Sequence, residues 1–592
     1  MTPKVPVKLT KYASVLARLL AVNLRPRRRS RRGAGRGTTL FALAVPVLVV
    51  GIAWRCDLSI VAHGAAWSEQ PAAESVKGKI PAEPATAAGG DEELAQHILL
   101  PGLLRGGSFL GGPAASPSPA ASSVPSASAS PTAVEHPEPT PSPSSPPPFV
   151  PAAEFFVAAA ASGSGDGSLD RPWTLQQALS QPASLKAGGL VWLRGGTYAA
   201  TWKTDPSLGR ISFSCGTHGT AEAPIVFRNY RDERVTIDGE ANEVVLFAQD
   251  CSFTWFWGLE LMSSAPVRTP SRSYIYGTAP DLKFINMFLH DMADGIDLWT
   301  TATNAELYGS LVYHNGWDET NGGHGHGIYT QNKTGVKRIQ DNIFFSQYGY
   351  NIKVWSTNQF VDNFVLEGNI VFNGGSLSEY ASRKFNFFVV GNNPAAPARN
   401  LVVRRNYTYA GNTTTTPACN AFGPNYGATD LILEDNYLLG QFRVGGPYVN
   451  CSIRRNHILG GTALGFITGT GFDRADYPDN VYAQELPTSG AEVFVLPNVY
   501  EPGRANVAIY NWGGADTVDV AADTLGLATG DRYQLIHAMD PFNDIITRSY
   551  DGGGTIPVPM TGHTFAQAIG SSKSPVSQFP RFGAFVVRRL GR

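Results

Sequence analysis

The chain has 592 residues, more than one ordinary hydrophobic core holds, and its composition changes sharply along its length. Together these facts exclude a single uniform domain. The formal net charge of -1 conceals an asymmetry, because residues 1–37 hold 11 Lys and Arg and no acid, whereas the remainder carries 36 basic and 48 acidic residues.

An uncharged hydrophobic run follows the basic leader. Residues 38–54, TTLFALAVPVLVVGIAW, come directly after RPRRRSRRGAGRG and are just long enough to span a hydrocarbon core. Because positive residues stay on the cytoplasmic side, we expect residues 1–37 in the cytoplasm, a transmembrane signal-anchor at 38–54 and the rest outside. Cleavage near residues 62–66 would instead give a secreted protein. The hydrophobic run explains the arginines, so no nucleic-acid partner is predicted.

Residues 55–150 form the next segment, and from 111 to 148 it is almost entirely Pro, Ser and Ala. This composition offers too little apolar surface to offset the entropy of folding, which predicts a disordered linker. Its prolines favour an extended chain that would hold a folded head away from the membrane.

The folded part is expected to start near Phe155, with GDGSLDRPWTLQQAL and then GGLVWLRGGTY. The first stretch resembles the segment that forms a capping helix in the pectate-lyase-like right-handed parallel β-helix superfamily, and the second resembles the first coil. The resemblance implies a fold and says little about a reaction.

Short apolar strands recur over residues 151–488, many with an asparagine before an apolar or aromatic pair. These asparagines are Asn286, Asn342, Asn369, Asn406, Asn436 and Asn456. Spacings such as 27 and 20 residues indicate a solenoid with insertions. Stacked asparagines at equivalent bends would hydrogen-bond along a column. We therefore predict an all-β chain whose main domain is a right-handed parallel β-helix.

Residues 489–592 show alternating apolar strands separated by Gly and Asp turns, which predicts a β-sandwich domain. It resembles the C-terminal sandwich modules attached to exported carbohydrate-active proteins. A plainer role is a cap over the open end of the solenoid.

Four cysteines lie in the folded part, and Cys56 adjoins the hydrophobic run. The local pairings are Cys215 with Cys251 and Cys419 with Cys451, although buried free thiols fit equally well. No metal-ligand spacing is present.

Three successive coils align as DGIDLW from Asp294, HGIYTQ from His326 and YNIKVW from Tyr350. Strand alternation points one set of side chains inward. The inward set is Ile296, Leu298, Ile328, Thr330, Ile352 and Val354. The outward set is Asp297, Trp299, Tyr329, Gln331, Lys353 and Trp355. Stacked strands lie about 4.8 Å apart, so Asp297, Tyr329 and Lys353 should form one outward column.

We expect Gly295, Gly327 and Asn351 to leave a shallow floor beside this column, on which a polysaccharide could rest. Two exposed indoles would flank it, and the loop YHNGWDETNGGHG would add polar groups. The predicted substrate-binding residues are Trp299, Trp355, Asp318, Glu319, His324 and Gln331.

The segments ADGID, GHGI and NIK resemble motifs of the polygalacturonases, which are β-helix pectin hydrolases. The resemblance implies that Asp294 is an active carboxylate, His326 an assisting histidine and Lys353 a ligand of the substrate carboxylate. Asn351 stands where the motif has arginine, and no separate coil supplies the paired aspartates.

The predicted catalytic residues are Asp294, Asp297, His326, Tyr329 and Lys353. A polysaccharide lyase would use Lys353 or His326 as base and Tyr329 as acid, with Asp294 and Asp297 binding calcium or tuning charge. A hydrolase would use two carboxylates among Asp294, Asp297, Asp318 and Glu319.

The same groups have plainer explanations as a surface charge pair and solvated loop histidines. We predict an enzyme acting on an acidic, uronate-containing polysaccharide. The alternative is a non-catalytic glycan-binding or adhesion module.

Overall fold

The structure is a computed structural model that describes residues 148–199, 203–270, 274–320, 322–380, 384–410, 419–460, 466–468, 472–483 and 485–591. The expected leader, the hydrophobic run at 38–54 and almost all of the expected linker lie outside these residues. No helix among the described residues is long and apolar enough to cross a membrane. Phe149, near the end of the expected linker, packs against Trp255 with ring centroids 6.1 Å apart.

A short helix starts the fold, as predicted. Helix α4 (Leu175–Leu179) begins with a complete capping box, in which the Thr174 side chain accepts from the Gln177 backbone and the Gln177 side chain accepts from the Thr174 backbone. Strand β1 (Ala153–Val157) precedes the helix and pairs in parallel with β2 (Gly189–Leu193), which follows it.

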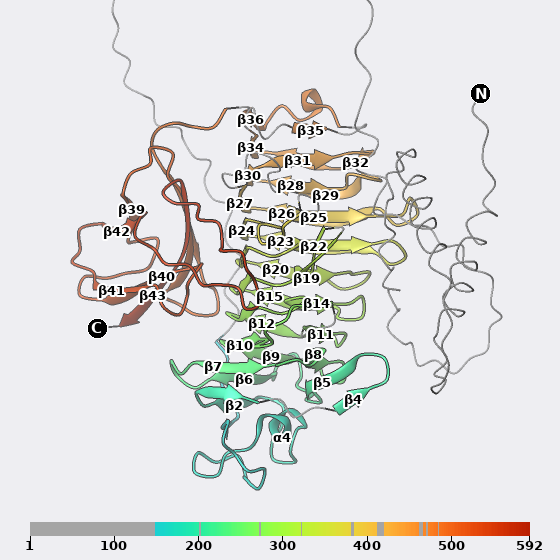
Figure 1. The fold of residues 1–592 in the computed structure, drawn as a ribbon, viewed down its shortest axis with the longest axis vertical. Coiled ribbons are helices and arrows are strands. Elements are labelled where there is room, and N and C mark those ends of the chain that lie inside the picture. Colours follow the sequence, from blue (N-terminus) through green and yellow to red (C-terminus); the bar gives the residue numbers. More distant parts are fainter. Residues whose placement is uncertain are drawn as a thin grey trace, which may run out of the picture. The chain divides into compact units, whose positions relative to one another are not determined.

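Three long sheets, here called A, B and C, share the strands of the main domain, and the chain visits them in turn (Figure 1). Sheet A contains β1, β2, β6 (Ile225–Asn229), β9 (Thr254–Trp257), β12 (Lys283–Ile285), β15 (Glu306–Tyr308), β20 (Lys337–Gln340), β23 (Val361–Glu367), β26 (Ala398–Arg404), β29 (Ala428–Glu434), β32 (Tyr448–Val449) and β33 (Ser452–Arg454). Sheet B contains β3 (Gly196–Tyr198), β7 (Val235–Asp238), β10 (Glu260–Met262), β13 (Phe288–His290), β16 (Leu311–Tyr313), β21 (Ile343–Phe345), β24 (Ile370–Phe372), β27 (Tyr407–Tyr409), β30 (Tyr437–Leu439), β34 (His457–Leu459) and β36 (Val481–Ala483).

Sheet C carries the residues of the aligned segments. It contains β4 (Lys203–Asp205), β5 (Gly209–Ser214), β8 (Val244–Ala248), β11 (Ile275–Gly277), β14 (Ile296–Leu298), β19 (His326–Thr330), β22 (Tyr350–Ser356), β25 (Phe385–Gly391), β28 (Cys419–Phe422), β31 (Gln441–Val444) and β35 (Phe466–Thr468). Neighbouring strands of the three sheets pair in parallel, apart from the antiparallel pair β4 and β5. The predicted parallel β-helix is confirmed.

Inward side chains of all three sheets form one continuous apolar core. Phe227, Phe256 and Phe284 stack through successive coils of sheet A, with ring centroids 5.6 and 5.3 Å apart. Each coil therefore buries its apolar face only against its neighbours, as in other solenoids.

An asparagine ladder runs along the bend between sheets A and B. The side chain of Asn342 donates to Asn369, which donates to Asn406, at 3.0 Å in each case. The ladder continues through Asn436, Asn456 and Asn480, the last of which the sequence analysis missed. Each buried side chain also bonds backbone groups of adjacent coils, for example Asn406 with the carbonyl of Leu366 at 2.9 Å.

Asn286 does not belong to this ladder, contrary to the prediction. In the two coils before Asn342, the ladder position is occupied by Met287 and then by Ser310. The backbone N–H of Ser310 donates to the Asn342 side chain at 2.9 Å, and the backbone N–H of Met287 donates to the Ser310 hydroxyl. Asn286 lies one residue earlier, with a positive φ of 52°, and bonds Asn498 and Glu501 of the C-terminal domain. The sequence pattern was therefore out of register by one residue at this coil.

The C-terminal domain is antiparallel throughout its described strands. One sheet has the order β37 (Glu492–Pro497), β38 (Arg504–Tyr510), β43 (Phe582–Gly591), β40 (Arg532–His537) and β41 (Ile545–Ser549), and a second pairs β39 (Thr517–Ala521) with β42 (Thr555–Pro559). Their facing side chains share an apolar core, which confirms a small sandwich. A short 3-10 helix, η1 (Arg474–Asp476), lies between β35 and β36, the last two strands of the β-helix domain in the sequence.

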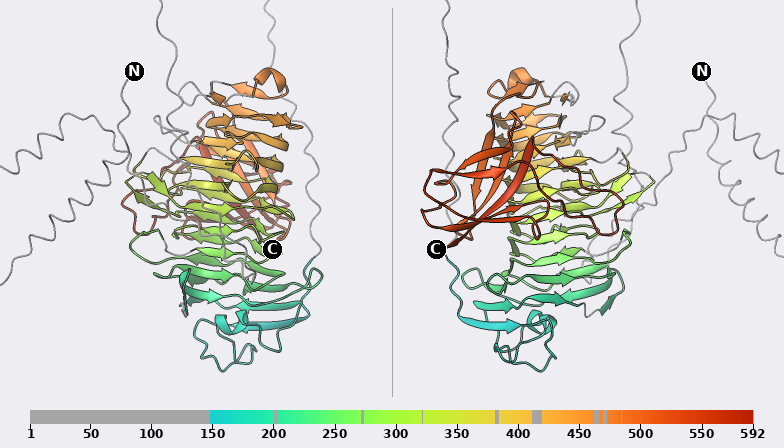
Figure 2. Two further views of the ribbon diagram at one scale, coloured as in Figure 1. Left: turned by 90° about the vertical axis from the view of Figure 1, so that its right-hand side faces the viewer. Right: turned by 60° about the vertical axis from the view of Figure 1, so that its left-hand side comes forward.

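The sandwich packs against the flank formed by sheet B, so the expectation of a cap over the open end is wrong (Figure 2). Tyr510 and Phe582 of the five-stranded sheet lie against Tyr409, with the Phe582 ring stacked 4.6 Å from it. The Tyr510 hydroxyl donates to the Thr408 carbonyl at 2.9 Å. The reason is that sheet B presents apolar side chains outward as well as inward, and these need a cover.

All four cysteines of the described residues are free thiols. Cys215 and Cys251 are neighbours, as in the first local pairing, but they are free thiols that hydrogen-bond to each other. Cys419 lies on the outer face of sheet C, whereas Cys451 packs at sheet A, so the second pairing does not match the fold.

Candidate functional site

The strands β14, β19 and β22 pair in the predicted register. Asp297 lies opposite Tyr329, and Tyr329 lies opposite Lys353, so the three residues form one column. The inward set also pairs as expected and lies in the core, with Ile328 and Ile352 completely buried. Parallel pairing of successive coils therefore brings together side chains that are up to 56 residues apart in the chain.

The column is less exposed than predicted. Asp297 is 5% exposed, Tyr329 8% and Trp355 7%, whereas Lys353 and Trp299 are partly buried. These aromatic side chains pack on each other and on Val390 and Phe388 of the next coil. Trp355 is therefore not an exposed indole, because the neighbouring coils cover it.

The expected shallow floor is absent. A Cβ at Gly295 would lie 2.4 Å from the Gly327 carbonyl oxygen, and one at Gly327 would lie 2.8 Å from the Phe344 ring. Asn351 is completely buried and donates to Asn386 at 3.0 Å and to the Phe372 carbonyl at 2.8 Å. All three positions are buried, so they leave no surface on which a polysaccharide could rest.

Lys353 is surrounded by aromatic rings. Its ammonium lies 4.8 Å from the ring centroid of Tyr329, 4.7 Å from that of Trp355 and 5.3 Å from that of Tyr350. Cation–π attraction holds the charge at this face of the sheet. A carboxylate on a ligand would find a positioned cation here.

Asp294 and Asp297 form a coupled pair of carboxyl groups. Asp294 accepts a 2.7 Å hydrogen bond from the His326 backbone N–H, which anchors it at the bend before β14. Burial raises the pKa of Asp294 to about 6, against the lowering effects of this bond and of the Lys353 charge. Burial and the charge of Asp294 hold the pKa of Asp297 well above its ordinary value, and Lys353 opposes them.

Two carboxyl groups with separated pKa values can share the work of acid and base, because one holds its proton where the other has lost it. Asp294 is partly exposed and Asp297 is buried. The two carboxyl groups therefore differ in exposure, and burial raises the pKa of both.

Tyr329, His326 and Gln331 complete the surroundings of the pair. The ring of His326 lies 5.5 Å from that of Tyr329. The side-chain amide of Gln331 donates to the Tyr329 hydroxyl at 3.2 Å and accepts from Thr300 at 3.3 Å. Trp299 packs edge-on against Tyr329 at 5.3 Å. Tyr329 is therefore fixed in place by its neighbours.

Asp318, Glu319 and His324 lie on a hairpin formed by β17 (Trp317–Glu319) and β18 (Gly322–His324). Trp317 stacks on His324 with centroids 5.4 Å apart and donates to Glu319 at 3.1 Å. Asp318 accepts from the backbone N–H of Glu379 at 2.8 Å. These contacts fix the hairpin to itself and to a neighbouring loop, and their role in binding a substrate stays a prediction.

The column continues into aromatic residues that the sequence analysis missed. Tyr276 pairs with Asp297, Phe247 pairs with Tyr276, and Phe388 follows Lys353 in the same register. All three are partly buried. Extending the alignment of the three segments by two coils toward the N-terminus and one toward the C-terminus would have found them. They give sheet C an aromatic row on both sides of the charged residues, which suits the stacking of sugar rings.

Lys337 is a second missed residue, completely buried beneath the site. Its ammonium donates to three backbone carbonyls, those of Leu298 at 3.0 Å, Trp299 at 2.9 Å and Gln331 at 2.7 Å. Burial lowers its pKa well below the ordinary value. The lysine ties together the ends of β14 and β19 and so positions Trp299 and Gln331.

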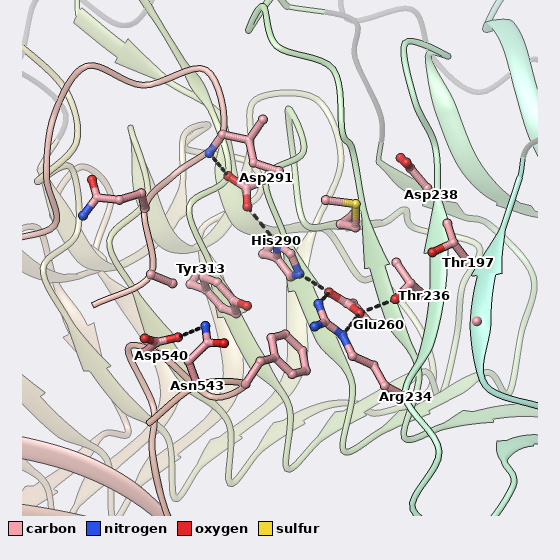
Figure 3. Close-up of a pocket in the computed structure, with 16 residues that line it drawn as sticks. Thr197, Arg234, Thr236, Asp238, Glu260, His290, Asp291, Tyr313, Asp540 and Asn543 are labelled. Atoms are coloured by element: carbon pink, nitrogen blue, oxygen red, sulfur yellow. Dashed lines mark hydrogen bonds and ion pairs between the residues drawn. The ribbon is translucent and has the colours of Figure 1, made fainter. Parts of the chain in front are cut away.

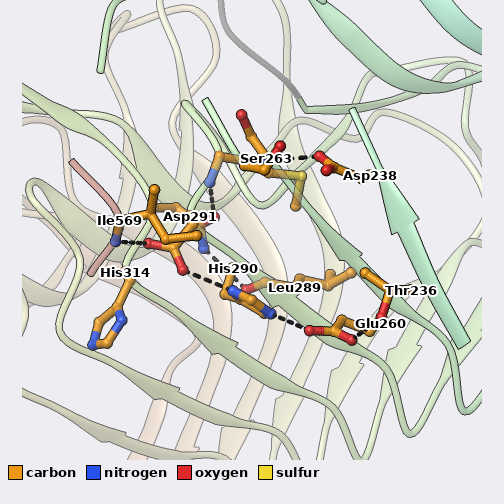
Figure 4. A network of polar contacts seen from close by, with 12 residues as sticks. Thr236, Asp238, Glu260, Ser263, Leu289, His290, Asp291, His314 and Ile569 are labelled. Atoms are coloured by element: carbon orange, nitrogen blue, oxygen red, sulfur yellow. Dashed lines mark hydrogen bonds and ion pairs between the residues drawn. The ribbon is translucent and has the colours of Figure 1, made fainter. Parts of the chain in front are cut away.

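A pocket of about 570 Å³ lies elsewhere, between sheet B and the C-terminal domain (Figure 3). Arg234 donates to both carboxylate oxygens of Glu260 at 2.7 and 2.6 Å, and Thr236 donates to it at 2.6 Å. His290 links the same carboxylate, at 2.9 Å, to Asp291, at 2.8 Å (Figure 4). No sequence pattern singled out these residues.

The charged groups of this network neutralise one another. Burial lowers the pKa of His290, but hydrogen bonds from the ring to Asp291 and Glu260 outweigh burial and raise it to about 9. Asp291 also accepts from the backbone N–H of Ile569 at 2.8 Å and pairs with Arg268. The network thus fastens the C-terminal domain to sheet B. The candidate catalytic carboxyl groups are therefore those at sheet C.

No protein-family model and no curated protein matches the chain. Among solved structures, a pectate lyase, Pel9A, is 17% identical over 56% of this chain and 79% of its own, with a TM-score of 0.41. A GH136 lacto-N-biosidase from Eubacterium ramulus is 12% identical over 56% of this chain and 68% of its own, with a TM-score of 0.34. A rhamnogalacturonan lyase is 14% identical over 52% and 84%, with a TM-score of 0.33. No residue role is taken from them, and the β-helix rests on this chain's own strand pairing.

Proposed function

We propose that the protein is an enzyme that hydrolyses an acidic, uronate-containing polysaccharide at the face of sheet C. The observation that carries the proposal is the coupled carboxyl pair, Asp294 and Asp297, beside a lysine and within an aromatic row. Hydrolysis of a glycosidic bond needs one carboxylic acid and one carboxylate.

The two aspartates differ in a way that assigns their roles. Asp297 is buried and keeps its proton, so it is the general acid for the departing oxygen. Asp294 is partly exposed and ionises first, so it is the carboxylate that activates water or attacks the sugar. Lys353, between the rings of Tyr329 and Trp355, binds the uronate carboxylate.

Lyase chemistry would use the same residues differently. It needs a base that removes the proton from the sugar carbon, for which Lys353 or His326 is the candidate. It also needs an acid that protonates the leaving oxygen, for which Tyr329 is the candidate. The face of sheet C presents two carboxyl groups, the pair that hydrolysis needs, and this favours hydrolysis over elimination.

The test is an assay of the purified chain against a panel of acidic and neutral polysaccharides. Hydrolysis gives new reducing ends without ultraviolet absorbance, whereas a lyase gives an unsaturated, absorbing product. Asp294→Asn and Asp297→Asn should each lower turnover at least about a hundredfold. Asp519→Asn, an exposed aspartate of the C-terminal domain, is the matched control. Binding of a polysaccharide without any cleavage would instead establish a non-catalytic module.

We also propose that the folded part is exported and tethered by residues 38–54. The basic leader, the hydrophobic run and the Pro/Ser/Ala segment support this order of parts. Protease added to intact cells should release a fragment that begins between residues 111 and 150. Protection of the whole chain would refute export.

A further inference from the structure

Three side chains with metal-ligand chemistry meet inside the C-terminal domain. His537 ends β40, Asp544 immediately precedes β41, and His563 follows β42. Each offers one ligand atom, and these atoms lie within 4.8 Å of one another. The group is separate from the column of sheet C and from the pocket on sheet B.

One carboxylate oxygen is the centre of the group. Asp544 Oδ2 lies 2.9 Å from His563 Nδ1, 3.4 Å from His537 Nδ1 and 2.9 Å from the backbone nitrogen of Thr564. The Thr564 carbonyl oxygen lies 3.1 Å from His537 Nδ1. Two imidazole nitrogens, a carboxylate and a carbonyl therefore converge on a small volume.

Hydrogen-bond geometry shows which nitrogen of His563 faces the group. Its Nε2 lies 2.9 Å from the Pro559 carbonyl, which can only accept, so Nε2 is the donor there. Nδ1 therefore faces Asp544 Oδ2, 2.9 Å away. The two atoms are directed at the same position, as two ligands of one ion would be.

The surroundings of the group are apolar and closed to solvent. The His563 side chain is 3% exposed and that of His537 is 1% exposed. Phe579 stacks on His563 with centroids 4.6 Å apart, and Phe585 lies 5.4 Å away. These rings hold the two imidazoles in fixed positions.

The kinds of ligand atom also suit a metal. Imidazole nitrogens and carboxylate oxygens are among the ligands that bind zinc-type ions in proteins.

We propose that His537, Asp544 and His563 bind one divalent transition-metal ion of the zinc type. The bond from His563 Nε2 to the Pro559 carbonyl fixes the ring tautomer, as outer-sphere partners of metal-binding histidines do. The site joins the ends of β40 and β42 to the start of β41. It stabilises the sandwich and has no part in the chemistry at sheet C.

The experiment is titration of the full chain with Zn²⁺ after removal of metals by a chelator. Calorimetry should show one ion bound per chain, and Zn²⁺ should raise the melting temperature. Co²⁺ should give the visible absorption of a tetrahedral site. His563→Gln and Asp544→Asn should weaken binding at least about tenfold. The control His218→Gln changes a histidine that is 53% exposed and should bind as the wild type does.

Two outcomes would overturn the proposal. One is a wild-type chain that binds neither Zn²⁺ nor Co²⁺ and melts at the same temperature with and without them, which would leave the three side chains as a hydrogen-bonded cluster without a metal. The other is unchanged binding in both site variants. The wild-type measurements decide the question even if a variant does not fold.

Discussion

Asp297 and Lys353 occupy the same register position on sheet C, one coil on either side of Tyr329. The Lys353 charge lowers the pKa values of both Asp297 and Asp294, against burial, which raises them. The protonation of the pair therefore depends on a residue two coils away, and a single substitution at Lys353 should change both binding and the pH dependence.

The wild-type enzyme should show a bell-shaped dependence of kcat/KM on pH. Activity should rise as Asp294 loses its proton near its pKa of about 6, and should fall at higher pH as Asp297, whose pKa is held above its ordinary value, loses its own. The pair titrates as a unit, so the two limbs give macroscopic values. Kinetics over pH 4 to 10, about three units on either side of neutrality, provide the measurement. A flat profile would contradict the assignment.

Lys353→Met should raise KM for a uronate polysaccharide and shift the acid limb to higher pH. The loss of the cation removes the partner of the substrate carboxylate and also the charge that lowers the pKa of Asp294. We expect about a tenfold or larger rise in KM, since charge-assisted hydrogen bonds contribute on this scale. An acid limb of the pH profile at the same pH in the variant and the wild type would show that Lys353 does not lower the pKa of Asp294.

Ile328 and Tyr329 are adjacent on β19 but face opposite sides. Ile328→Ala should cost about 2 to 5 kcal/mol of unfolding free energy, because it empties a completely buried position in the solenoid core. Tyr329→Phe keeps the ring and removes only the hydroxyl bonded by Gln331, at a cost of about 1 kcal/mol. Denaturant unfolding measures both. Equal costs would show that the predicted alternation is wrong.

Strand register was the part of the fold that the sequence could predict best. A period of two puts Ile296, Ile328 and Ile352 on one face, and a one-residue slip would have exposed them all, so the alignment had one acceptable solution. Burial of the outer face was not predictable in the same way. It depends on how closely the side chains of Tyr329 and Trp355 pack against neighbouring coils, and the spacing of residues in the sequence does not predict this packing.

Turns between strands caused the other errors. Gly295 and Asn286 lie where the chain bends, and there a single residue changes which side chain faces the core. The cover over sheet B could have been predicted, because every residue of β21 is apolar and both faces of the strand must therefore be buried. Phe344 lies in the solenoid core, and Ile343 and Phe345 lie under the sandwich. The network of His290 had no such signal, since Glu260 and Ile569, which bond to His290 and to Asp291, lie in separate segments of the chain.

The His290 network predicts that the stability of the fold depends on pH. Glu260 and Asp291 bond the two nitrogens of the ring, and Asp291 in turn holds the backbone of Ile569. The folded pKa of His290 is about 9, above an unfolded value of about 6.5. Its contribution is therefore complete below about pH 6.5 and disappears as the pH rises through about 9.

The contribution of His290 at neutral pH and below should be on the order of 3 kcal/mol, from the difference between the folded and unfolded pKa values. Unfolding free energies measured near pH 6.5 and near pH 9.5 should thus differ in the wild type, with lower stability at the higher pH. His290→Gln should lose most of this difference, whereas the exposed His218→Gln should retain it. A wild type and a His290→Gln variant that lose the same stability over this interval would show that another group titrates.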